Sequence, residues 1–180
     1  GHQGGGQGAG PAAVGARLQH VRALTVESEN EFIGLDAATR RNLELTETLR
    51  NQDTAGGNAP TLFSLLDHCR TAMGSRLLRH WLHHARRDQN IARARHAAVN
   101  ALMRTDACSG LSGTLAAVPD IERITTRIAL LSARPRDLAG LRAGLQQLGS
   151  LHAYVEMCGR DADAPLLGQL HEDLATPVEC

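Results

Sequence analysis

Apolar side chains recur every three or four residues along most of the chain, which is the period of an amphipathic helix. The clearest run predicts a helix over residues 72–83, and two more cover residues 120–132 and 135–157. The last of these would be about 30 Å long, and its leucines come close to a heptad seam. From the apolar positions of these runs we expect a core that contains Leu77, Trp81, Leu82, Ile124, Ile128, Leu141 and Leu145.

Capping residues mark where several helices begin. Asp36, Thr61 and Asp88 can each accept the unpaired amide hydrogens of a following helix. Pro135 suits the first position of its helix, because the hydrogen bond that proline cannot donate is missing there in any case. Besides the three amphipathic runs, we expect helices over residues 37–45, 62–66, 89–103, 112–118 and 164–175.

The N-terminal part of the chain has a different character. Residues 1–11 are rich in glycine and glutamine, which predicts a flexible tail or a tag remnant. Residues 12–24 could form a short helix. Residues 25–35 are strand-like and could form a small hairpin. The fold class is therefore all-α, an irregular multi-helix bundle with long helices and room for one small β-hairpin near the N-terminus.

The basic side chains, histidine aside, are all arginine, and 19 of them balance 19 acidic residues. Because the chain has no lysine, it has no P-loop lysine, no Schiff-base lysine and no Ser–Lys nucleophile pair. Zero net charge argues against strong nonspecific attraction to nucleic acid.

The cysteines are Cys69, Cys108, Cys158 and Cys180, which lie far apart and show no CxxC spacing. This pattern is typical of reduced thiols in a cytosolic protein rather than of a disulfide or zinc framework. No apolar run reaches about 18 residues and no signal peptide is recognisable, so we expect a soluble protein without a membrane span.

Three histidines invite a metal-binding interpretation and one serine a catalytic interpretation, but neither pattern is complete. His80, His83 and His84 share one helix, but no cysteine or carboxylate pattern supplies the rest of a zinc site. Ser112 does not match a nucleophile elbow, because no strand precedes it. We therefore predict no catalytic, cofactor-binding or metal-binding residue.

The arginines leave two interpretations open. Arg123, Arg127 and Arg134 could line one helix face and make weak contacts with phosphate groups. Alternatively, they form solvated helix surface and local ion pairs, which the zero net charge and the lack of an aromatic stacking platform favour. Arg40 and Glu44 are four residues apart and could pair on their helix.

Three blocks of sequence occur in order between Leu24 and Thr176. They are Asp36 to Glu44; Thr61 to Asp67 with Thr71, Met73, Gly74, Arg76, Leu77, Trp81 and Leu82; and Asp120 to Arg123 with Ala133 to Leu138. Together they resemble the core domain of the MutS family of DNA mismatch-repair proteins. Ala72 and Ala85 stand where relatives commonly have proline, and alanine lets a helix continue past such a point.

The resemblance implies that residues 12–24 end a connector region and that residues 25–180 form the first part of the core, or lever, domain before the clamp insertion. The parent protein would act in the bacterial cytosol at the nucleoid. It would dimerise around mismatched duplex DNA, bind ATP with Mg²⁺, and recruit a downstream repair protein. The family's Phe-x-Glu motif, clamp and ATPase domain are absent from this sequence. We therefore expect a non-catalytic fragment that has no cofactor and little or no DNA binding of its own.

Three alternatives remain at this stage. A stand-alone helical adaptor would leave an exposed apolar stripe after folding. A small arginine-based DNA-binding module would show steep salt dependence. A MutS paralogue could act in another pathway of DNA metabolism.

Overall fold

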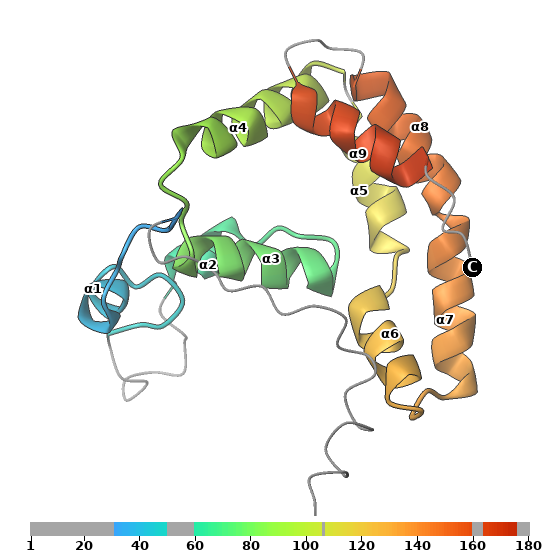
Figure 1. Cartoon of the computed structure of the whole chain (residues 1–180), viewed down its shortest axis with the longest axis horizontal. Helices are drawn as coiled ribbons and strands as arrows, with labels where there is room; N and C mark the ends of the chain where they lie inside the picture. Colours follow the sequence, from blue (N-terminus) through green and yellow to red (C-terminus); the bar gives the residue numbers. More distant parts are fainter. Residues whose placement is uncertain (1–30, 50–59, 106, 160–163, 176–180) are drawn as a thin grey trace, which may run out of the picture.

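The computed structural model describes residues 31–49, 60–105, 107–159 and 164–175, and these are predominantly helical with no β-strand among them. The helices form an open arc (Figure 1). The first three lie at one end, α4 spans the arc, and α5 to α9 make up the other side. The all-α prediction is confirmed. The predictions for residues 1–24 lie outside the described residues.

The helix bounds follow the sequence patterns closely. They are α1 (Ala37–Asn42), α2 (Leu62–Leu66), α3 (Ala72–His83), α4 (Gln89–Arg104), α5 (Cys108–Ala116), α6 (Ile121–Ala129), α7 (Pro135–Gln146), α8 (Leu148–Gly159) and α9 (Pro165–Ala175). Most predicted helices are confirmed to within a few residues. The helix expected over 112–118 begins earlier, at Cys108. None of these helices is long and apolar enough to cross a membrane.

The predicted caps are present. Asp36 accepts a hydrogen bond from the Thr39 amide at 2.6 Å. At the start of α2, Thr61 and Ser64 exchange side-chain-to-backbone hydrogen bonds in a capping box. Asp88 accepts from the Asn90 amide at 2.9 Å. These local polar bonds supply partners for amide hydrogens that a helix cannot satisfy within itself, which is why they could be recognised from the sequence.

The hairpin expectation needs correction over its described portion. Residues 25–30 lie outside the described residues, and residues 31–33 pair with a distant segment rather than a neighbouring one. Phe32 forms an isolated antiparallel bridge with Arg86, and the Ile33 amide donates to the Ala85 carbonyl at 2.8 Å. The strand-like character was visible in the sequence, but the partner lies beyond α3.

The single long helix predicted over 135–157 is interrupted at Gln147, which separates α7 from α8. The two helices still follow one another along the same side of the arc (Figure 1). The Gln147 amide donates to the Gly144 carbonyl at 3.0 Å, a tightened last turn. The glycines Gly144 and Gly149 flank this break, and glycine weakens a helix interior.

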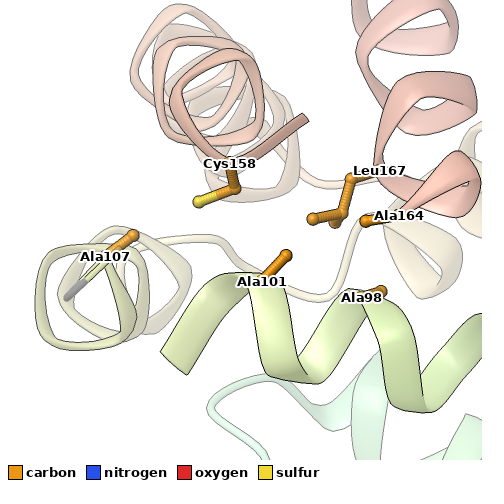
Figure 2. Close-up of a cluster of buried hydrophobic side chains, with 6 residues drawn as sticks. All are labelled: Ala98, Ala101, Ala107, Cys158, Ala164 and Leu167. Carbon is orange, nitrogen blue, oxygen red and sulfur yellow. The ribbon is translucent and has the colours of Figure 1, made fainter. Parts of the chain in front are cut away.

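The main core lies where α4, α5, α8 and α9 meet. Figure 2 shows its side chains converging. The buried members are Ala98, Ala101, Ala107, Cys158, Ala164 and Leu167, and Leu102, Tyr154 and Leu166 pack against them. Four of the six are alanines, so the helix backbones approach closely and little side-chain volume separates them.

The predicted core is only partly correct. Ile124 is buried, and Leu82, Ile128 and Leu141 are half-buried. Leu77, Trp81 and Leu145 are 47%, 37% and 51% exposed, so the assignment of these three to the core is wrong for this chain. Their helical spacing predicted apolar faces on α3 and α7, but the neighbouring elements leave these three side chains partly exposed.

Candidate functional site at the helix junctions

A charged junction joins α3 to α6 across the interior of the arc. The Arg76 guanidinium donates to both carboxylate oxygens of Asp120, at 2.8 and 2.7 Å, and to Glu122 at 2.6 Å. Asp120 also caps α6 by accepting from the Arg123 amide at 3.2 Å. One carboxylate therefore starts α6 and holds it to α3, so the position of one helix depends on the other.

The electrostatics of this junction favour the ionised pair. Hydrogen bonds from Arg76 are the main reason that the pKa of Asp120 is lowered to about 2. The same contacts raise the pKa of Arg76. A planar guanidinium that donates two parallel bonds to a carboxylate fixes direction as well as distance, which a lysine ammonium would not do.

A second charged contact closes the turn between α6 and α7. Asp137 is buried; it accepts from the Arg127 guanidinium at 2.7 Å and from the Arg134 amide at 2.9 Å. The backbone hydrogen bond from Arg134 is the largest cause of its lowered pKa, with the Arg127 charge also contributing. The two helices are thus tied at the turn as well as along their lengths.

Two glycines allow helices to approach without room for a side chain. A Cβ at Gly144 of α7 would lie 3.1 Å from both Ile121 and Pro119, at the start of α6. A Cβ at Gly110 of α5 would lie 2.6 Å from the Tyr154 ring of α8. The α5–α8 crossing therefore has no room for a side chain at Gly110, whereas the α6–α7 crossing is only tight at Gly144.

The three arginines proposed for phosphate contact are not equivalent. Arg123 and Arg127 both lie near carboxylates, Arg123 at 3.5 Å from Asp120 and Arg127 paired with Asp137. Arg134 is exposed, and its backbone contributes to the α7 cap. These contacts agree with local ion pairing rather than with a continuous phosphate-binding face.

The predicted Arg40–Glu44 pair is not what the structure contains. The Glu44 carboxylate instead accepts from the Leu49 amide at 2.8 Å. The Arg40 Nε is buried and has no hydrogen-bond partner among the described residues. Helix α1 ends at Asn42, so the two residues no longer share a helix face.

The histidines of α3 do not gather into one site. His80 and His84 stack with ring centroids 4.3 Å apart, whereas His83 bonds to the Thr46 hydroxyl at 3.0 Å. Burial lowers the pKa of His83. The Ser112 hydroxyl accepts from Arg70 at 2.6 Å, and arginine cannot serve as a general base.

The sequence patterns missed two contacts that need distant helices. Arg95 of α4 lies 3.6 Å above the Trp81 ring of α3, and burial lowers its pKa. His152, Glu156 and His171 come together between α8 and α9. The spacing of His152 and Glu156 on one helix was visible, but the third member depends on how α9 packs.

Taken together, these contacts define a helical framework whose geometry is set by polar junctions and close backbone crossings. The family model described as MutS domain III matches residues 38–178, which is most of the chain. The chain belongs to the MutS family of DNA mismatch-repair proteins. The resemblance drawn from the three sequence blocks is thereby confirmed.

Proposed function

We propose that this chain is a non-catalytic lever segment of a longer MutS protein. In that protein it would couple ATP binding at one end to DNA clamping at the other. The observation that carries the proposal is the bidentate Arg76–Asp120 contact, which ties α3 to α6 over 44 residues of sequence. A framework with such junctions transmits a displacement as a unit, because dense cores and paired charges resist deformation.

The proposed partners follow from the family and from the charges. Mismatched duplex DNA, a second MutS subunit and a downstream repair protein would contact other domains of the parent, which would also hold ATP and Mg²⁺. The segment itself would bind DNA weakly, since Arg76 and Arg127 already pair with carboxylates and the net charge is zero. The parent would work in the bacterial cytosol.

The exposed apolar side chains fit a segment that other parts of MutS cover. Leu131 is 95% exposed at the tip between α6 and α7, and its neighbour Leu130 is 59% exposed. Leu131 also adopts a left-handed backbone conformation (φ 55°), where glycine is the usual residue. A large apolar side chain held there against its backbone preference supports a contact made outside this chain.

Fluorescence anisotropy with matched and mismatched duplexes tests the absence of DNA recognition. At low and moderate salt we expect weak binding that does not distinguish the two duplexes. Tight binding with a preference for the mismatch would place recognition in this segment and overturn the proposal. Tight binding to both duplexes with a steep salt dependence would favour the arginine-based DNA-binding module instead.

The lever itself is tested in the full-length protein that carries this segment. We expect Arg76→Gln to leave ATP hydrolysis without DNA nearly unchanged and to weaken the ATP-induced conversion to a sliding clamp. The matched control is Arg142→Gln, an exposed arginine of α7. Normal clamp conversion in Arg76→Gln would remove the α3–α6 junction from the proposed mechanism.

The exposed tip also favours a second candidate, a stand-alone helical adaptor for a protein partner. Association with the remaining MutS domains, measured for the wild type and for Leu131→Gly, distinguishes the two. Under both proposals the substitution relieves backbone strain and removes the apolar contact. A lever segment loses its association with the remaining MutS domains supplied as a separate chain. An adaptor does not associate with those domains, with or without the substitution.

A further inference from the structure

The helix pair α8 and α9 brings two imidazoles and a carboxylate to one place. His152 and Glu156 lie one turn apart on α8, and His171 lies on α9. The ligand atoms that the three residues offer all lie within 4.8 Å of one another. Among the described residues this is the one group of three or more possible metal ligands that converges in this way.

The two histidine rings already face each other closely. Their centroids are 4.3 Å apart with an interplanar angle of 32°. Both residues are half-buried, whereas Glu156 is exposed. This places two nitrogen donors in the partly buried interface between the helices and an oxygen donor on a solvent-exposed side chain.

One polar atom of this group lacks a protein partner. The His152 Nε2 is buried and has no hydrogen bond within the described part of the structure. A buried nitrogen without a partner carries a free-energy cost. An imidazole nitrogen readily binds a metal ion through its lone pair. Glu156 and His171 offer two further ligand atoms for the same ion.

We infer that His152, Glu156 and His171 form a binding site for a divalent transition-metal ion, with Zn²⁺ as the best fit, and that this ion clamps α9 to α8. Two histidines and one carboxylate are a donor set that zinc takes, with water completing the tetrahedron. With bond lengths of about 2.0–2.2 Å, tetrahedral ligands stand roughly 3.3–3.6 Å apart. Because the present separations are at most 4.8 Å, side-chain rotations that close them by about 1.5 Å or less would meet that geometry.

The role assigned to this ion is structural. Leu167 and Ala164 of the main core belong to the same α9 region, so a clamp at His171 would hold the helix that completes that core. Magnesium does not suit the site, because it prefers oxygen ligands. The site does not depend on the proposed lever function.

Isothermal titration of the metal-free chain with Zn²⁺ tests the site. We expect one equivalent to bind to the wild-type chain. His152→Gln, Glu156→Gln and His171→Gln should each weaken binding by roughly tenfold or more, since even residues behind the ligands have effects of that size. Glu156→Gln changes an exposed side chain, so it separates loss of a ligand from loss of folding.

The matched control is the double variant His80→Gln and His84→Gln. It removes a histidine pair at the C-terminal end of α3, His80 within the helix and His84 as its C-cap, which stacks at the same 4.3 Å centroid distance as the proposed site. We expect its zinc affinity to equal that of the wild type. No stoichiometric zinc binding by the wild type, or equal binding by the three site variants, would overturn the inference.

Two further measurements test the ligand type and the stabilising role of the ion. Co²⁺ in the site should give a visible spectrum without sulfur-to-metal charge transfer, whereas such a band would assign the metal to exposed thiols such as Cys69 or Cys108 and overturn the site. Zn²⁺ should raise the thermal midpoint of the wild type, and Mg²⁺ at the same concentration should not. A wild-type thermal midpoint that Zn²⁺ leaves unchanged would overturn the proposal that the ion holds α9 against α8.

Discussion

Different interactions stabilise the two ends of the arc. Around α8 and α9, mostly small apolar side chains are buried and helix backbones lie close together. Around α1 to α3, few side chains are buried, and capping bonds, ion pairs and cation–π contacts connect the elements. The first region carries its own core, whereas the second exposes apolar faces such as that of Leu77 and Trp81.

This contrast teaches where stability and where orientation come from. Burial of apolar surface is non-directional and stabilises the α4–α5–α8–α9 region as a unit. Hydrogen-bonded ion pairs contribute little stability at a surface but fix the direction of the groups that they join. In a lever segment, the first region would serve as the rigid body and the second as the part that other domains complete.

The largest expected loss of stability comes from shortening a buried side chain of the alanine-rich core. Leu167→Ala should destabilise the chain by about 2–4 kcal/mol, because Leu167 is 3% exposed and its removal leaves a cavity. Leu170→Ala on the same helix, where the side chain is 42% exposed, should cost about 1 kcal/mol or less. Urea titration measures both. Equal losses would mean that α9 is not packed as described.

The glycine crossing of α5 and α8 should respond almost as strongly. Gly110→Ala should cost about 1–3 kcal/mol, because its Cβ would overlap the Tyr154 ring. Gly113→Ala in the same helix meets nothing within 4 Å and should instead stabilise the chain by up to about 1 kcal/mol. Opposite signs in urea titrations of the two variants are the expected signature of the crossing.

The charged junction should appear as pH dependence. The pKa of Asp120 is about 2 in the folded chain and 3.8 in its reference state, so between these values the unfolded chain binds more protons. The contribution of Asp120 is therefore present above about pH 5 and is lost as pH falls toward 2. In Arg76→Gln the thermal midpoint should be lower at pH 7 but should converge with that of the wild type in acid.

Arg142→Gln is the control for this junction, because it removes the same charge from an exposed position on α7. Its thermal midpoint should follow the wild-type curve at every pH. A gap between Arg76→Gln and wild type that stays constant from pH 7 to pH 2 would show that Asp120 is not the partner that matters.

The smallest expected effect is at the Trp81 ring. Arg95→Gln should cost about 0.5–1 kcal/mol through loss of the cation–π contact, and it should shift the fluorescence of this single tryptophan. Arg93→Gln, two residues away and exposed, should change neither stability nor fluorescence. An unchanged emission spectrum in Arg95→Gln would mean that the guanidinium does not lie over the ring in solution.

Local chemistry made part of this structure predictable. Asp36, Thr61 and Pro135 each act within one helical turn, so their roles follow from neighbouring residues alone. The helical period likewise identified α3 to the residue, and the three sequence blocks identified the family. These features need no knowledge of what packs against what.

Tertiary structure decided what the sequence pattern could not. An apolar helix face shows that something can pack there, but only the position of a second helix decides how much of it is buried. Leu77 and Leu145 remain 47% and 51% exposed. The Arg76–Asp120 junction and the His152–Glu156–His171 group likewise join distant positions. Their geometry depends on helix packing, which arises from contacts summed over the whole chain rather than from the local preference of any one residue.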